Sequence, residues 1–254
     1  MADGALHGFG VLVTRPRPQA SELIAAIEAE GGEAIPFPVL EIRPQRPETV
    51  ETDAHRLEKP DIAIFVSANA VRYGLPYAAD AAICAIGPAT AAAIEESGLN
   101  VAIRSTDGFD SEHLLAEPAL QEVAGQTVRI IRGTTGRELL AESLRERGAD
   151  VQYLSVYERR LPEYAGHELQ ELASRWATGD IDCVTVMSVA SLTNLLKLLP
   201  TRCLDQLAET PLVTPAARVI KEAHNRLPGS RHKLADGPQA GDMIRAIIEL
   251  AQSG

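Results

Sequence analysis

The sequence predicts an α/β fold of two similar lobes, each a parallel β-sheet flanked by helices, joined by a two-stranded extended linker. Three observations predict it. Short β-branched runs alternate with longer stretches rich in Ala, Leu and Glu, which is the pattern of βα units. An ordered set of segments occurs twice along the 254 residues. Two extended segments bounded by proline stand at equivalent positions of the two copies.

The first half shows the alternation most clearly. Strands are expected at 11–14, 62–67, 83–86 and 101–104, and helices at 19–30, 69–78, 89–97 and 111–117. The strand segments are almost continuously apolar rather than alternating in polarity. Strands of this kind are typical of parallel sheets that helices cover on both faces.

The internal repeat consists of four blocks that keep their order. The blocks at 11–16, 61–71, 85–90 and 106–115 match those at 128–133, 182–192, 212–217 and 235–244. The offset grows from 117 to 129 residues and never decreases, as expected if the second copy has longer loops. We therefore interpret the chain as two homologous halves, about 1–120 and 121–254.

The segments 36–44 and 153–162 interrupt the pattern, and a polar, helix-compatible stretch follows each. A chain that leaves one lobe near residue 40 must return near residue 157, and the two crossings could then pair with each other. This predicts one lobe from 1–38 plus 160–254 and a second from 44–154, with 36–44 and 153–162 as the crossing linker. Two contiguous lobes are the alternative that the sequence leaves open.

Composition favours small-molecule chemistry. The net charge is −11, with no basic run, so neither nucleic acid nor a membrane surface is an expected partner. The three cysteines form no C-x-x-C pair, and no signal peptide or apolar run of about 18 residues is visible. We expect a cytoplasmic protein. Nucleotide-binding glycine motifs, a nucleophile elbow and an acidic strand-end cluster are missing, so no cofactor or metal is expected.

Residues that follow the expected strands are the candidate binding residues, because ligands of open α/β sheets bind beyond the carboxyl ends of the strands. Many are small or hydroxylated residues at expected helix starts, where backbone N–H groups and the helix dipole favour an anion. An ordinary helix cap, or a surface ion pair for an arginine, is the simpler explanation of any one taken alone. Asp107 also follows an expected strand. The candidates are Arg15, Ser67, Ala68, Asn69, Gly87, Thr90, Arg132, Thr134, Ser188, Thr214, Ala216 and Ala217. Arg137, away from a strand end, is a further candidate cation for an anionic ligand.

These segments resemble the uroporphyrinogen-III synthase (HemD) family of tetrapyrrole and heme biosynthesis. The resemblance rests on VLVTRP, FVSANAV, AIGPATA, RIIRGTTGRELLAESLRERGA and VYER, in that order, and spans about 11–247. It implies a lyase that cyclises hydroxymethylbilane, a linear tetrapyrrole with eight carboxylates. The implied reaction loses water, passes through an azafulvene and a spiro intermediate, and inverts ring D without a cofactor or metal. The implied fold is two α/β lobes joined by a two-stranded linker.

The resemblance also implies that Tyr157 assists the departing hydroxyl as a proton donor. A phenol is protonated at neutral pH and can donate a hydrogen bond. It is a weak acid because its reference pKa of about 10 is far from neutrality. Packing in the linker is the alternative role of Tyr157.

The second copy departs from the Gly-Pro-x-Thr-like loop that is common in the family. The first copy has this loop at 87–90, whereas the second copy has Thr214 at the glycine position and Ala217 at the position of Thr90.

We therefore expect a monomeric synthase that acts on a small molecule. A transient contact with hydroxymethylbilane synthase is a further hypothesis. A non-catalytic two-lobe module that binds small anions is the alternative of another class. A two-lobe glycosyl or phosphoryl transferase is a third, although the sequence lacks a nucleotide fingerprint.

Overall fold

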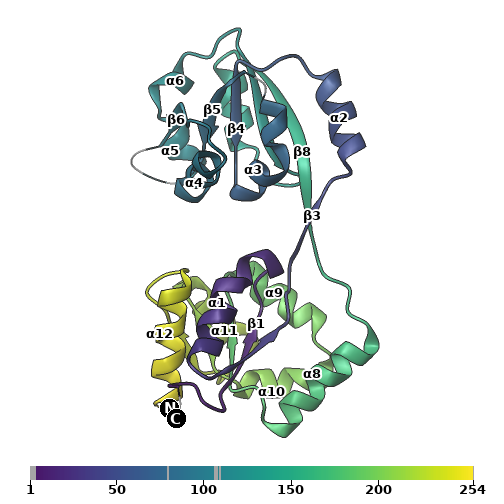
Figure 1. Cartoon of the computed structure of the whole chain (residues 1–254), viewed down its shortest axis with the longest axis vertical. Coiled ribbons are helices and arrows are strands. Elements are labelled where there is room, and N and C mark those ends of the chain that lie inside the picture. The colour runs from purple at the N-terminus through teal and green to yellow at the C-terminus, as the bar shows by residue number, and fades with distance from the viewer. Residues whose placement is uncertain (1–3, 79, 106–107, 109, 254) are drawn as a thin grey trace. The chain divides into compact units, whose positions relative to one another are not determined.

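The computed structural model describes residues 4–78, 80–105, 108 and 110–253, so that Asp107 lies outside the described residues. The chain divides into two compact units (Figure 1). Unit 1 comprises Met1–Glu41 and Arg160–Gly254, and unit 2 comprises Ile42–Arg159. Within the described part of the chain, no helix has both the length and the hydropathy needed to cross a membrane.

Unit 1 is built on a parallel sheet with the strand order β11-β10-β9-β1-β2. Its strands are β1 (Gly10–Val13), β2 (Glu33–Pro36), β9 (Cys183–Thr185), β10 (Leu212–Thr214) and β11 (His232–Leu234). All residues of β1, β9 and β10 are buried. These central strands therefore have the continuous apolar character of a sheet covered on both faces.

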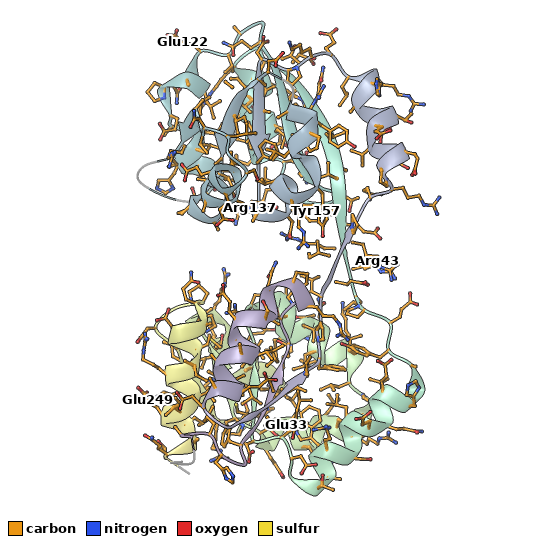
Figure 2. All side chains as sticks on the ribbon, viewed as in Figure 1. Glu33, Arg43, Glu122, Arg137, Tyr157 and Glu249 are labelled. Carbon is orange, nitrogen blue, oxygen red and sulfur yellow. The ribbon has the colours of Figure 1, made fainter. Side chains whose placement is uncertain are left out.

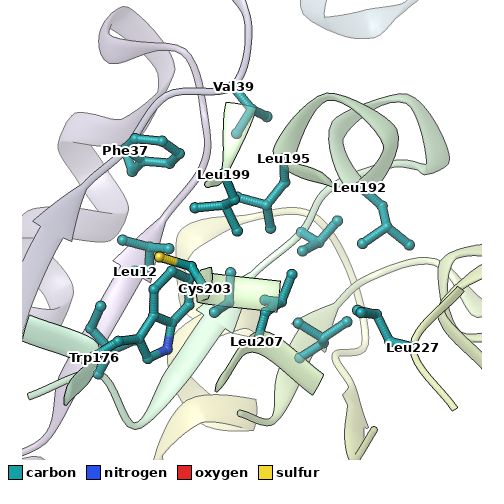
Figure 3. Close-up of a cluster of buried hydrophobic side chains, with 14 of the residues drawn as sticks. Leu12, Phe37, Val39, Trp176, Leu192, Leu195, Leu199, Cys203, Leu207 and Leu227 are labelled. Carbon is teal, nitrogen blue, oxygen red and sulfur yellow. The ribbon is translucent and has the colours of Figure 1, made fainter. Parts of the chain in front are cut away.

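Helices cover both faces of this sheet. They are α1 (Arg17–Ala29), α8 (Gly166–Thr178), α9 (Val189–Leu198), the 3-10 helix η2 (Thr201–Cys203), α10 (Leu204–Glu209), α11 (Ala217–Arg226) and α12 (Ala240–Ala251). Leu12 packs with Trp176 and Leu195 in one buried cluster (Figure 3), whereas Val11 and Val13 pack with Met243 in another. Neighbouring residues of a strand point to opposite faces. The two clusters are therefore the cores on the two sides of the sheet.

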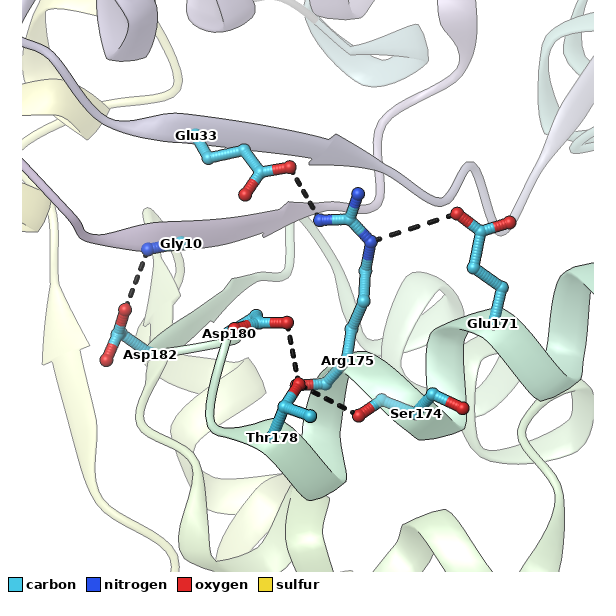
Figure 4. A network of polar contacts seen from close by, with 8 residues as sticks. All are labelled: Gly10, Glu33, Glu171, Ser174, Arg175, Thr178, Asp180 and Asp182. Atoms are coloured by element: carbon cyan, nitrogen blue, oxygen red, sulfur yellow. Dashed lines mark hydrogen bonds and ion pairs between the residues drawn. The ribbon is translucent and has the colours of Figure 1, made fainter.

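Polar contacts attach α8 to the edge of the sheet in unit 1 (Figure 4). Arg175 forms an ion pair with Glu33 of β2 at 2.5 Å, and its Nε lies 4.0 Å from Glu171 on its own helix. Thr178 donates a hydrogen bond to Asp180 at 2.6 Å. These contacts fix the end of α8 beside the four-residue edge strand.

Unit 2 contains a six-stranded sheet with the order β3-β8-β7-β4-β5-β6. Its strands are β3 (Glu41–Pro44), β4 (Ile62–Phe65), β5 (Ala82–Ala85), β6 (Ile103–Arg104), β7 (Thr127–Gly133) and β8 (Asp150–Arg160). Its helices are α2 (Pro47–Arg56), α3 (Ala68–Gly74), the 3-10 helix η1 (Leu75–Ala78), α4 (Pro88–Glu96), α5 (Ser111–Leu115), α6 (Pro118–Gln121) and α7 (Leu139–Glu146). The pairings β8-β7-β4-β5-β6 are parallel.

The repeat gives the two sheets the same strand order. Matching β1, β2, β9, β10 and β11 with β7, β8, β4, β5 and β6 turns one order into the other. At the centre of each sheet, a strand from one half of the sequence therefore pairs with a strand from the other half. Equivalent aspartates support both pairs: Asp182 accepts the N–H of Gly10 at 2.7 Å (Figure 4), and Asp61 accepts the N–H of Thr127 at 2.8 Å.

The two extended segments differ in one respect that the sequence pattern did not predict. Residues 153–160 belong to a continuous strand of 11 residues, β8, whereas the equivalent part of the first copy is divided between β2 and β3. Pro36 and Pro38 stand at that division. Phe37 and Val39, which alternate with these prolines, still donate to the carbonyls of Val13 and Thr14 at 2.9 and 3.1 Å. The prolines therefore remove N–H groups only on the side of the chain that faces away from β1.

Candidate active site

A pocket of about 220 Å³ lies in unit 2 at the carboxyl edge of the sheet. Its walls include Val66 after β4, Ile86 after β5, Arg132 at the end of β7 and Tyr157 on β8. Ligands bind at this edge in open α/β sheets. Three of the residues predicted as site residues, Arg132, Arg137 and Tyr157, line this one pocket.

Tyr157 lies on β8 (labelled in Figure 2). It lines the pocket and is almost completely buried, with 2% of the residue's surface exposed. The pairing of β7 with β8 shifts by one residue after Arg132, so Gly133 rather than Thr134 lies opposite Tyr157. A Cβ atom on Gly133 would lie only 2.8 Å from Cε2 of the ring. The irregular pairing and the glycine together therefore make room for the aromatic side chain.

The hydroxyl of Tyr157 lies 3.1 Å from Oγ of Ser67, at hydrogen-bond distance. Ser67 is the N-cap of α3, and its Oγ also accepts the N–H of Ala70 at 3.1 Å. Ala68 is exposed and Asn69 is half-buried on the first turn of the same helix. One serine therefore joins the end of β4, the start of α3 and the phenol.

Of the remaining candidates of unit 2, Arg137 is among the residues that line the pocket, whereas Gly87, Thr90 and Thr134 are not. Gly87 is the N-cap of α4, where its carbonyl accepts the N–H of Thr90, and the Thr90 side chain is buried. Thr134 is exposed, and its N–H donates to the carbonyl of Tyr157 at 2.9 Å. Arg137 lines the pocket with 74% of its side chain exposed, 3.8 Å from Glu112. An exposed pair at this distance contributes little to stability, so Arg137 can rearrange around a ligand.

Arg132 is the buried cation of the pocket, with 7% of its side chain exposed. Its Nη1 donates to Glu138 at 3.0 Å, and its Cζ lies 4.6 Å from the centre of the Tyr153 ring. The hydroxyl of Tyr153 donates to the other oxygen of Glu138 at 2.5 Å. The hydrogen bonds from Tyr153 and Arg132 lower the pKa of Glu138, and burial together with Glu138 raises the pKa of Tyr153. Glu138 is therefore held as a carboxylate beside the guanidinium.

In unit 1, Arg15 occupies the position that the repeat matches with Arg132. It donates to the carbonyl of Pro238, and its Nε is buried without a hydrogen-bond partner among the described residues. Burial lowers the pKa of Arg15. The side chain lines a separate pocket of about 350 Å³ beside Ile24 and Pro36.

The other candidates of unit 1 lie at two helix starts. Ser188 is the N-cap of α9, and its Oγ accepts the N–H of Ser191 at 3.1 Å. Thr214 is buried, and its hydroxyl accepts the N–H of Ala216 at 3.3 Å. Ala217 is exposed at the start of α11. The hydroxyl of Thr214 thus stabilises the turn into α11.

The sequence reasoning did not single out Tyr153 or Glu138. Glu138 lies in the RGTTGRE segment and Tyr153 on β8, and nothing in their spacing indicates that both contact Arg132. Among the described residues, no group of three or more His, Cys, Asp and Glu side chains could hold a metal ion. Cys84, Cys183 and Cys203 are buried free thiols.

The fold and the pocket define a class of protein: a two-unit α/β protein with repeat-related parallel sheets, and an arginine and a tyrosine at the carboxyl edge of one sheet. A family model described as uroporphyrinogen-III synthase HemD matches residues 21–245. The chain belongs to the uroporphyrinogen-III synthase family.

Two relatives agree with this assignment. The chain is 31% identical over 252 residues to the uroporphyrinogen-III synthase of Escherichia coli, covering 94% of this chain and 100% of that protein. It is 34% identical over 210 residues to the Salmonella typhimurium uroporphyrinogen-III synthase, covering 76% of this chain and 80% of that protein. The resemblance inferred from the motifs is confirmed.

Solved structures show the same fold. A mutant uroporphyrinogen III synthase from Thermus thermophilus matches with a TM-score of 0.60 and 20% identity, covering 97% of this chain and 100% of that chain. The uroporphyrinogen-III synthetase of Helicobacter pylori matches with a TM-score of 0.58 and 16% identity, covering 96% of this chain and 99% of that chain. The predicted fold class, two lobes with parallel sheets flanked by helices, is confirmed.

Proposed function

We propose that this protein is a uroporphyrinogen-III synthase that cyclises hydroxymethylbilane with loss of water and inversion of ring D through a spiro intermediate. Its membership of the family along almost the whole chain carries the proposal. The pocket that brings together Arg132, Arg137 and Tyr157 supports it, because the substrate has both carboxylates and a departing hydroxyl.

Tyr157 is the proposed donor to the departing hydroxyl. Its phenol is part of the pocket wall and lies at hydrogen-bond distance from Ser67, which can fix the direction of the O–H bond. Donation to the leaving oxygen would help form the azafulvene. The acid is weak, so the larger part of catalysis is expected from holding the bilane in the conformation that closes through ring D.

The arginines and helix starts are the proposed contacts for carboxylates. Arg132 and Arg137 offer guanidinium groups in one pocket, and a guanidinium can bind a carboxylate through two parallel hydrogen bonds. At the helix starts, the exposed Ala68 and Ala217 are the proposed sources of backbone N–H groups, because those of Thr90 and Ala216 already donate to Gly87 and Thr214. Such local donors must overcome the net charge of −11, which opposes the approach of a polyanion.

The remaining properties follow from the same proposal. The enzyme is a cyclising hydro-lyase that needs no cofactor or metal, acts as a monomer in the cytoplasm and makes at most transient contact with hydroxymethylbilane synthase. Three buried free thiols support a reducing compartment. Residues 36–44 and 153–162 are the proposed linker between lobes of 1–38 plus 160–254 and 44–154.

A coupled assay tests the proposal. Hydroxymethylbilane is generated from porphobilinogen by a deaminase, with and without this protein, and the oxidised porphyrins are separated by isomer. Unassisted closure gives the type I isomer, so type III product that depends on this protein supports synthase activity. Type I product alone, from a folded sample, refutes it and favours the non-catalytic anion-binding module.

A further inference from the structure

The guanidinium of Arg132 is held from two directions by residues outside the set predicted from the sequence. Glu138 accepts its Nη1 at 3.0 Å, and the Tyr153 ring lies beneath it with 4.6 Å between Cζ and the ring centre. Tyr153 and Glu138 are themselves joined by a hydrogen bond of 2.5 Å. Arg132, Glu138 and Tyr153 therefore form a closed triangle of contacts.

The triangle leaves part of the guanidinium available. Glu138 is the hydrogen-bond partner of Nη1, while Nη2 lies beside Gly136 in the pocket wall. A Cβ atom at Gly136 would come within 2.5 Å of Nη2, so a larger residue there would crowd this side of the group. Both oxygens of Glu138 already accept hydrogen bonds, one from Arg132 and one from Tyr153.

We propose that Glu138 and Tyr153 are positioning residues that hold Arg132 so that its Nη2 side, next to Gly136, receives a carboxylate of the substrate. The inference rests on the proposed function and deepens it by assigning the residues that prepare one carboxylate contact. Neither residue takes part in the chemistry of ring closure. Their effect is exerted on substrate affinity through Arg132.

Preorganisation is the physical basis of this role. A long, flexible arginine side chain loses rotamer freedom when it binds a ligand, and that loss weakens affinity. Contacts with Tyr153 and Glu138 restrict the side chain before the substrate arrives. Removal of either contact should therefore raise KM by about tenfold and leave kcat within about twofold.

The test compares Glu138→Ala with Glu142→Ala. Both glutamates are exposed and one helical turn apart, so the two substitutions remove the same charge from the same region. We expect KM to rise about tenfold for Glu138→Ala and to stay within about twofold for Glu142→Ala. Tyr153→Leu should resemble Glu138→Ala, whereas Tyr153→Phe keeps the ring under the guanidinium and should recover part of the affinity.

A double substitution distinguishes a positioning role of Glu138 from a general effect on protein stability. In an Arg132→Ala background, Glu138→Ala should raise KM no further, because the group it positions is gone. The dissociation constant for uroporphyrin III, an octacarboxylate macrocycle, provides a second readout and should follow KM. Equal KM and Kd values in the Glu138→Ala and Glu142→Ala variants overturn the inference, as does a wild-type chain that binds no uroporphyrin. If the wild-type chain binds uroporphyrin III but forms no type III isomer, the proposed function is refuted but the positioning role is not. The Kd values of the Glu138→Ala and Glu142→Ala variants then decide whether Glu138 positions Arg132.

Discussion

Replacing Tyr157 by phenylalanine removes one hydroxyl and leaves the packing of the ring intact. The ring is buried against Gly133, so its apolar contacts remain. Ser67 loses a partner at 3.1 Å but still accepts the N–H of Ala70, and the cap of α3 is kept. The loss of one neutral hydrogen bond costs about 1 kcal/mol. For a unit of this size, that lowers the melting temperature by about 4 °C.

The expected loss of activity is larger than this small loss of stability. A positioned acid contributes about 10²–10⁴ to the rate, and a phenol is a weak acid whose contribution belongs at the lower end. We therefore expect kcat for type III product to fall about 100-fold. KM should change little, because Arg132 and Arg137, the proposed contacts for the carboxylates, are untouched. The coupled assay with isomer separation gives both constants, and thermal unfolding gives the stability.

Tyr73→Phe is the matched control for this substitution. The centre of the Tyr73 ring lies 6.5 Å from that of the Tyr157 ring, and the partly buried Tyr73 packs against the cluster that contains Tyr157. The same chemical change is therefore made next to the site. Its kcat should stay within about twofold of the wild type, because no proton donor is lost from the pocket. Retention of kcat by Tyr157→Phe, together with the expected drop in melting temperature, would refute the acid role.

Three further predictions concern stability. Gly133→Ala places a Cβ atom 2.8 Å from the Tyr157 ring, so the free energy of unfolding measured by urea denaturation should fall by about 1–3 kcal/mol. An unchanged denaturation midpoint would contradict this packing. Burial and the neighbouring His224 ring lower the pKa of His232 below 6.5. As pH falls below that value, the unfolded chain takes up a proton that the folded chain resists, so stability should fall, and less steeply in His232→Gln. Asp182→Ala removes the acceptor of the N–H of Gly10, the first residue of β1, and should lower the free energy of unfolding by about 1.5–3 kcal/mol. Amide hydrogen exchange should become faster in unit 1 and not in unit 2.

The repeat and the apolar strand segments were sufficient to predict the sheets, because both are recorded in local sequence. The helix expected at 19–30 corresponds to α1 at Arg17–Ala29, and the strand expected at 83–86 to β5 at Ala82–Ala85. The continuous strand β8 and its irregular pairing with β7 were not predictable. They depend on contacts between distant residues and on the volume of the Tyr157 ring against Gly133.

The site shows the same division. The strand-end rule indicated Arg132, Arg137 was a candidate donor to carboxylates, and the family resemblance implied Tyr157; the structure brings these three into one pocket. The directions of other side chains could not be predicted, because a helix start specifies the backbone but not how the helix is rotated against its sheet. The buried side chain of Thr90 shows this, as does the contact of Tyr153 with Arg132.

The discontinuity of unit 1 has a consequence for synthesis on the ribosome. Gly10 and Asp182, which join β1 to the segment entering β9, are separated by 172 residues of chain. At about 5–20 residues per second, β1 waits about 10–30 s for its central partner. Unit 2 is contiguous from Ile42 to Arg159, so it can complete its sheet while the buried face of β1 is still uncovered. The nascent segment β1-α1-β2 is therefore the part on which we expect a chaperone to act during synthesis.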